Sequence, residues 1–239
     1  MKKILVPTLI ASAIAAMAPV VQAQESSLSY NVGVVSDYRY RGISQTRLQP
    51  ALQGGIDYAD KSGFYVGAWG STIKWIKDSG GDAPVEIDLY GGYKGAVGDV
   101  GYDVGFLRYE YTRNRLPINA NTNEVYGAVS YGLFTAKYSH AISNLFGFDN
   151  SKNSSYLDLS ANFDLGNGLT LTPHVGRQTV KNNAGSTYTD YSVTLTKDFG
   201  NGLSGSLTLV DTNNDSYVYT PTNKNLGKSG AVVGLKYSF

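Results

Sequence analysis

Strict alternation of apolar and polar residues is the feature of this chain that most limits its fold. Residues 230–239 show it most clearly, because Gly234, Lys236 and Ser238 follow Val232 on one face and the other carries Ala231, Val233, Leu235, Tyr237 and Phe239. Successive side chains of a β-strand point to opposite faces, so the pattern predicts a strand with one apolar side. The same alternation recurs at residues 85–89, 157–165 and 191–196.

Twelve segments follow this pattern, and the connections between them alternate between short and long. Two of the short connections contain Asn-Gly pairs, at 167–168 and 201–202, which suit tight hairpin turns because both central residues need positive φ. An even strand number with short turns at one end and long loops at the other predicts an all-β fold. More specifically, the pattern predicts a transmembrane antiparallel up-and-down β-barrel with short periplasmic turns and long extracellular loops. The predicted strands span residues 28–40, 50–59, 64–73, 85–94, 99–111, 124–131, 133–142, 155–165, 169–178, 190–199, 203–211 and 230–239.

A secreted β-sandwich would also alternate, with its apolar face turned to a shared core. Two features favour the barrel. Polar residues occur at mid-strand, where a hydrated lumen accepts them, and tyrosines recur near strand ends, where a membrane interface accepts them. The tyrosines assigned to these interfaces are Tyr30, Tyr40, Tyr58, Tyr93, Tyr102, Tyr111, Tyr156, Tyr191 and Tyr237.

Residues 1–23 have the three parts of a secretory signal. Lys2 and Lys3 form the basic region, residues 4–17 are apolar, and residues 21–23 supply the small side chains that a signal peptidase reads. The apolar stretch is shorter than the roughly 20 residues of a membrane-spanning helix. We expect residues 1–23 to be cleaved and residues 24–239 to form a single barrel domain in the outer membrane of a Gram-negative bacterium.

Composition and motif spacing argue against catalysis, metal binding and nucleic-acid binding by this chain. It has no cysteine, and its 20 Lys and Arg nearly balance its 19 Asp and Glu, so thiol chemistry is excluded and nucleic-acid binding is not expected. Ser139 and His140 are adjacent, which places them on opposite faces of a strand and not as a nucleophile and its base. His174 has no further ligands at a readable spacing, so a lumen residue is favoured over a metal ligand. We predict no enzyme activity, no cofactor and no catalytic, cofactor-binding or metal site.

The polar faces of the strands carry charges of both signs. Arg39 and Arg41, beside the first long loop, are either entry residues that favour anionic or zwitterionic solutes or structural partners of Asp37 and neighbouring carboxylates. Across the lumen, opposed charges could orient dipolar solutes or pair into a plug, and twelve strands allow both. The predicted pore-lining residues are Asp37, Arg39, Arg41, Glu86, Asp88, Asp103, Lys137, Asp158 and His174.

The predicted strand at residues 99–111 changes phase. Its apolar face begins with Tyr102, Val104 and Phe106 and continues with Leu107, Tyr109 and Tyr111, while Arg108 and Glu110 occupy the polar face. A β-bulge near Phe106 and Leu107 would absorb the change.

Several segments resemble a known family. Residues 35–46 (VSDYRYRGISQT), followed by 50–58 (PALQGGIDY), 62–69 (SGFYVGAW) and 86–93 (EIDLYGGY), are similar to the opening of the TorF-type porins, a proteobacterial family formerly described as a conserved domain of unknown function. The resemblance implies a porin for passive diffusion of small hydrophilic solutes. The alternative is a closed barrel whose extracellular loops have a structural or surface-interaction role.

The C-terminal residues 235–239 (LKYSF) are similar to the signal that the barrel-assembly machinery recognises, with Tyr237 and Phe239 as its aromatic positions. The expected partners are this machinery, outer-membrane lipid, lipopolysaccharide and small hydrophilic solutes.

Overall fold

The computed structural model describes residues 26–239, and the predicted signal peptide at residues 1–23 lies outside the described residues. Alternating segments become strands of one sheet, as the sequence predicts. These strands are β1 (Ser27–Val35), β4 (Ala51–Ala59), β5 (Phe64–Thr72), β6 (Val85–Val97), β7 (Val100–Glu110), β8 (Thr122–Tyr131), β9 (Phe134–Ala141), β10 (Ser155–Ala161), β11 (Phe163–Gly166), β12 (Leu169–Thr179), β13 (Tyr188–Gly200), β14 (Leu203–Thr212) and β17 (Gly230–Ser238).

The long connections contain only short elements. They are β2 (Arg39–Tyr40), β3 (Ile43–Ser44), α1 (Trp75–Asp78), η1 (Ala184–Ser186), β15 (Val218–Tyr219), η2 (Thr220–Thr222) and β16 (Lys224–Asn225). Within residues 26–239, no helix has the length and apolarity of a helical membrane span.

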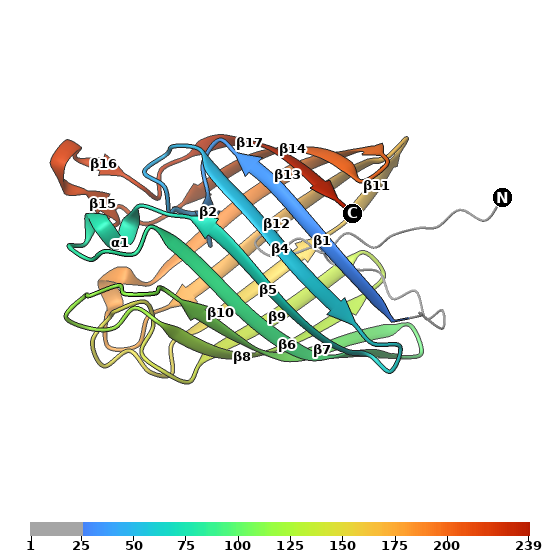
Figure 1. Cartoon of the computed structure of the whole chain (residues 1–239), viewed down its shortest axis with the longest axis horizontal. Coiled ribbons are helices and arrows are strands. Elements are labelled where there is room, and N and C mark those ends of the chain that lie inside the picture. Colours follow the sequence, from blue (N-terminus) through green and yellow to red (C-terminus); the bar gives the residue numbers. More distant parts are fainter. Residues whose placement is uncertain (1–25) are drawn as a thin grey trace.

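The sheet closes on itself into a barrel (Figure 1). Each strand pairs antiparallel with its neighbours in the chain, and β1 pairs with both β4 and the last strand, β17. The segments β10 and β11 both pair with β12 and form successive parts of one barrel strand. The predicted twelve-stranded antiparallel barrel is therefore confirmed.

The two ends of the barrel differ in their connections. At one end, which we call the turn end, tight turns join the strands, and the two Asn-Gly pairs adopt the predicted positive φ, with Asn167 and Asn201 both at 52°. At the other end, the loop end, lie the long connections and α1 (Figure 1).

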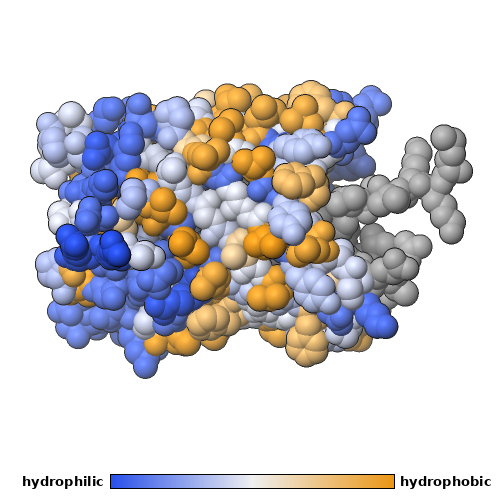
Figure 2. Space-filling model, in the orientation of Figure 1, coloured by the Kyte–Doolittle hydropathy of each residue, from blue (hydrophilic) through white to orange (hydrophobic). Residues whose placement is uncertain are grey.

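The outer face of the barrel is apolar and the inner face is polar. Outward side chains such as Leu28, Val66, Leu209 and Val233 are more than half exposed, and Figure 2 shows such residues gathered along the barrel wall, with hydrophilic residues over the loop end. The buried polar residues of the strands lie at the alternate, inward positions. The polarity of this barrel is thus reversed relative to a soluble protein.

The main hydrophobic cluster fills the inside of the loop end. Ile76 of α1 is fully buried there, so the helix covers part of this mouth. The cluster consists of Tyr38, Ala51, Trp69, Ile73, Ile76, Ala83, Tyr109, Tyr111 and Ala120.

The first strand ends earlier than predicted, at Val35 and not at residue 40. At Ser36 the backbone N–H donates to the carbonyl of Val233 and the side-chain oxygen accepts from the N–H of Val233, after which the chain bends into the barrel. Tyr38 and Tyr40 are consequently inside the barrel. The predicted interfacial position is therefore wrong for Tyr40, and also for Tyr111 and Tyr156, which are buried on the inner face.

The predicted β-bulge near Phe106 and Leu107 is also wrong. Pairing of β6 with β7 runs without a register shift along both strands, so Tyr109 and Tyr111 point into the barrel. Arg108 and Glu110 are paired with each other on the outer face, 2.5 Å apart. The apparent phase change arises because the inward positions at the loop end are aromatic, as the cluster there requires.

Candidate functional site

Residues 36–49, which we call the lumen loop, fold into the barrel and narrow its lumen by contacting the inner wall. The short hairpin β2–β3 lies within this loop. The Tyr38 hydroxyl donates to Glu86 on β6 at 2.6 Å, and the hydroxyls of Tyr40 and Tyr109 are hydrogen-bonded to each other. These contacts fix the loop against β6 and β7.

Arg41, at the tip of the hairpin, reaches the opposite wall. Its guanidinium donates to Glu124 on β8 at 2.7 Å and to Gln178 on β12 at 2.7 Å. It also lies over the rings of Tyr40 and Tyr156, at 4.8 and 4.3 Å. A guanidinium stays protonated in proteins, and the carboxylate of Glu124 balances its charge here. Arg41 is therefore a permanent cation that spans the lumen.

Arg39 holds the base of the lumen loop. It is paired with Asp37 and donates to the carbonyl oxygens of Gly42, Leu226 and Lys228 at 2.9–3.0 Å. The guanidinium thereby ties the first long connection to the last one. The sequence left two roles open for Arg39 and Arg41, solute entry or structural pairing. Each arginine forms an ion pair with a carboxylate, which is the contact expected of the structural role.

Several carboxylates surround the lumen loop on the inner wall. Glu86 accepts hydrogen bonds from Tyr38 and Tyr111, at 2.6 and 2.8 Å. Asp158 on β10 lies 2.7 Å from the Nε2 of His174 on β12. Asp190 on β13 accepts from the hydroxyl of Tyr156 at 3.1 Å. Asp88 takes part in none of the ion pairs among the described residues.

The turn-end half of the lumen is less tightly packed, because its inward residues are half-buried and leave accessible surface. Two tyrosines hydrogen-bond carboxylates there: Tyr90 donates to Asp57, and Tyr65 donates to Asp103 at 2.6 Å. Lys137 lies over the ring of Tyr126, with its Nζ 3.9 Å from the ring centroid. We call this half of the lumen the vestibule.

Glycines on the inner wall let these tyrosine rings lie against the strands. A Cβ at Gly67 would lie 2.4 Å from the ring of Tyr90, and one at Gly105 would lie 2.5 Å from the hydroxyl of Tyr126. Both distances are too short for any other residue to fit without displacing the ring. The bore of the vestibule thus depends on paired glycine and tyrosine positions.

Toward the turn end, strands β12 to β14 line the lumen with uncharged hydroxyls. Thr194 and Thr208 are hydrogen-bonded at 2.9 Å, and Thr172 donates to Asn162 at 2.7 Å. The vestibule therefore has tyrosines and charges on one side and hydroxyl groups on the other, and both are hydrophilic.

All nine predicted pore-lining residues lie in the lumen loop or at inward strand positions, with Asp88, Asp158 and His174 at the level of the loop and Asp103 and Lys137 in the vestibule. Sequence reasoning missed Glu124, Gln178 and Asp190, which contact Arg41 or its neighbours. The signal for Glu124 was present, because it shares the phase of Tyr126 and Ala128 on β8.

The residues weighed for catalysis do not converge. Ser139 is buried on the inner face, whereas His140 points outward and bonds to Asn153 at 3.2 Å. Among residues 26–239, no group of three or more His, Asp or Glu side chains is placed to hold a metal ion.

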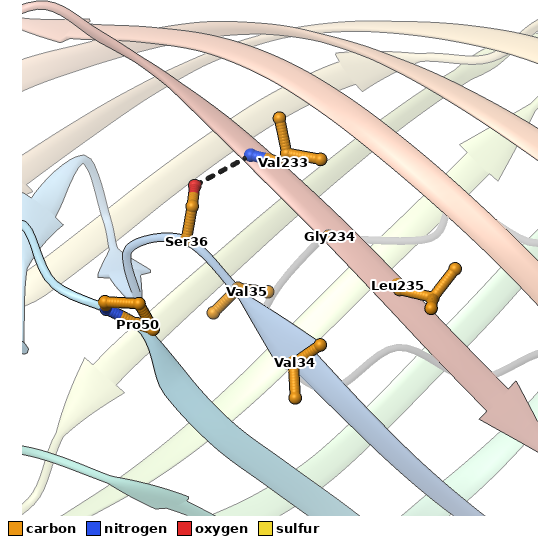
Figure 3. Close-up of a pocket in the computed structure, with 7 residues that line it drawn as sticks. All are labelled: Val34, Val35, Ser36, Pro50, Val233, Gly234 and Leu235. Carbon is orange, nitrogen blue, oxygen red and sulfur yellow. Dashed lines mark hydrogen bonds between the residues drawn. The ribbon is translucent and has the colours of Figure 1, made fainter.

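The bend of the lumen loop into the barrel leaves a hollow of about 290 Å³ on the outer face, drawn in Figure 3. It lies where β1, β17 and the start of β4 meet, and its lining is almost entirely apolar. The lining residues are Val34, Val35, Ser36, Pro50, Val233, Gly234 and Leu235.

Comparison with known proteins adds a family and a fold. A sequence model described as "Bacterial protein of unknown function (Gcw_chp)" matches residues 21–239. No curated protein matches the chain. Among solved structures, the KdgM porin is similar at a TM-score of 0.57 and 10% identity, over 90% of this chain and 99% of that one. The NanC porin is similar at 0.57 and 11%, over 89% and 99%, and Omp33 of Acinetobacter baumannii at 0.50 and 7%, over 91% and 99%. At such identities the likeness extends to the fold.

Proposed function

The chain belongs to the Gcw_chp family of bacterial proteins of unknown function, and we propose that it is an outer-membrane channel through which small hydrophilic solutes diffuse passively. The observation that carries this proposal is the reversed polarity of the closed barrel, with apolar side chains outside and charged or hydroxyl side chains inside. A lipid bilayer is the environment in which such an outer face is stable, because a closed barrel satisfies its backbone groups internally.

Export and assembly are part of the same proposal. Cleavage after residue 23 would deliver residues 24–239 to the periplasm of a Gram-negative bacterium. Tyr237 and Phe239 would then be read by the assembly machinery, and their rings lie 5.7 Å apart and are exposed on the outer face, where lipid or a partner can reach them. We further propose, on the motif resemblance of residues 35–58, that the chain is a TorF-type porin. No cofactor or catalytic residue is needed.

The lumen charges favour cations and neutral solutes over anions. Arg39 and Arg41 are each paired with a carboxylate, so neither is left to attract an anion. Inward carboxylates also outnumber inward cations, and the field of a lumen raises the local concentration of ions of opposite sign. The inward carboxylates are Asp37, Asp57, Glu86, Asp88, Asp103, Glu124, Asp158 and Asp190, against Arg39, Arg41, Lys94, Lys137 and Lys236.

One observation favours the second candidate, a closed barrel with a structural or surface-interaction role. Tyr38, Glu86 and Glu124, which meet at the lumen loop, are almost completely buried. If the loop keeps this position, solutes cross slowly or not at all, and the long extracellular loops would carry the function.

Planar-bilayer recording of refolded residues 24–239 tests both candidates. The matched variant replaces residues 38–46 of the lumen loop with a short Gly-Ser linker, and heat-modifiable migration in gels confirms that each barrel is folded. We expect small ohmic steps from the natural chain and larger steps from the variant. A silent natural chain with a conducting variant would establish the closed barrel. Two folded but silent barrels would overturn the channel.

A further inference from the structure

Among residues 26–239, Asp88 and Asp158 are the inward carboxylates with buried oxygens that accept no hydrogen bond. Asp158 forms an ion pair with His174, whereas Asp88 takes part in no ion pair, and this sets Asp88 apart. Its side chain is only 7% exposed, and its Oδ1 is fully buried and accepts no hydrogen bond from residues 26–239. By contrast, Glu86, Asp57 and Asp103 each accept a hydrogen bond from a tyrosine hydroxyl. Burying a carboxylate without a hydrogen-bond partner costs folding free energy, so we expect a bound ligand to supply that partner.

The surroundings of Asp88 define what that group is. In the sheet, Trp69 on β5 and Tyr109 on β7 lie directly opposite Asp88 and share its inward face. The charges that act on Asp88 most strongly are Glu86 and Glu124, both negative. Glu124 is already paired with Arg41, so the carboxylates of Glu86 and Asp88, together with the two aromatic side chains, form a site for a further positive charge.

A path to Asp88 runs from the vestibule. Toward the turn end of β6, the next inward positions are Tyr90, Gly92 and Lys94, and all three have accessible surface. On the other side of Asp88 lie Glu86 and the lumen loop. A solute that enters from the vestibule therefore meets Asp88 at the constriction.

We propose that Asp88, flanked by Trp69 and Tyr109, binds the ammonium group of a small amine and makes the channel prefer such cations. A carboxylate provides the charge-assisted hydrogen bond and the aromatic rings provide cation–π contact, which together are how proteins hold ammonium groups. A bare divalent metal is not favoured, because no group of three ligands is placed for one among residues 26–239. The selectivity rests on the proposed channel function, whereas the binding itself does not.

Tryptophan fluorescence tests the binding without any conduction. The chain has two tryptophans, and Trp75→Phe leaves Trp69, beside Asp88, as the reporter. Folded Trp75→Phe barrel in detergent is titrated with methylammonium chloride, with N-methylglucamine chloride keeping the ionic strength constant. We expect a saturable change in emission whose midpoint rises at least about tenfold when Asp88→Asn is added, since a full charge is removed.

Glu110→Gln is the matched control, because it also converts a carboxylate to an amide but on the outer face, paired with Arg108. This control should leave the titration unchanged. A linear, unsaturable response of the Trp75→Phe barrel would overturn the site, and so would an equal midpoint in the Asp88→Asn variant.

Reversal potentials in a potassium chloride gradient test the selectivity. A unit charge about 5 Å from the ion path in a water-like dielectric changes the local ion concentration about fourfold. Cations are enriched and anions are depleted by this factor, so Asp88→Asn should lower the cation-to-anion permeability ratio about sixteenfold, and Glu110→Gln should not. An unchanged ratio in a conducting Asp88→Asn barrel would overturn the selectivity role. Failure of the channel itself would instead be seen as absence of current, with the fluorescence result still deciding the binding.

Discussion

Substitution of Arg41 by methionine is predicted to release the lumen loop. The guanidinium is 7% exposed and Glu124 is 1% exposed, with 2.7 Å between Nη2 and Oε2. Methionine keeps most of the apolar stem but leaves Glu124 buried beside Asp88 and Tyr109 without its cation. The structure thus predicts a loss that comes mainly from the orphaned charge.

The size of the loss follows from the burial of the pair. Removing one partner of a buried ion pair costs about 3–5 kcal/mol, because the other charge stays desolvated. Replacing both partners by uncharged groups is often close to neutral. The double variant Arg41→Met, Glu124→Gln should therefore recover most of the stability that the single variant loses.

Urea unfolding of the barrel in lipid vesicles measures the free energy of unfolding. Amide hydrogen exchange in β2 and β3 reports whether the loss of stability is confined to the lumen loop. If the loop undocks alone, about 3 kcal/mol corresponds to roughly a hundredfold faster exchange or more at residues 39–44. Arg115→Met is the matched control. Its pair with Asp82 is 3.5 Å long and 70% and 55% exposed, so it should cost less than about 1 kcal/mol. A loss as small as that of the control, or a double variant no better than the single one, would refute the reasoning.

Three further predictions concern the wall, a turn and the last strand. Gly176→Ala places a Cβ 2.0 Å from the tyrosine hydroxyl of β10 and should cost about 1–3 kcal/mol in urea unfolding, whereas Gly127→Ala, 4.0 Å from its nearest neighbour, should cost little. The pKa of Asp60 is lowered to about 2, first by the side-chain hydroxyl of Ser62. The stability advantage of the natural chain over Asp60→Asn should hold above about pH 4 and vanish as pH falls toward 2, measured by unfolding across that range. Phe239→Ala should reduce the amount of barrel in isolated outer membranes while refolded protein still gains heat-modifiable migration.

The fold was predictable from sequence because the signal for it is local. A period of two, Asn-Gly turns and loop lengths are each set by neighbouring residues, and twelve such segments leave few ways to close a sheet. The end of β1 was not predictable in this way. Tyr38 and Tyr40 continue the alternation of Val32 and Val34, and what stops the strand is a pair of hydrogen bonds between Ser36 and Val233, nearly 200 residues away.

The same limit applies to the site. Sequence placed charges in the lumen because they share a phase with other polar residues, but it could not show that a loop occupies the bore. Inward positions at the level of the loop are aromatic because they pack against it. From sequence alone, Tyr109 and Tyr111 were therefore mistaken for part of the apolar outer face. The change of phase that predicted a bulge is caused instead by packing of the lumen loop against β7.

The segment that carries the family resemblance is the one that builds the constriction. Asp37 accepts hydrogen bonds from Ser44 and Thr46 as well as its ion pair with Arg39. Gly42 has a φ of 80°, and a Cβ there would lie 2.5 Å from Thr212 at the end of β14. Almost every position of this segment is thus held by a partner, so its sequence encodes a docked loop as much as a strand. A barrel with an unobstructed bore would not need these residues, and their presence ties the function of this chain to the position of the lumen loop.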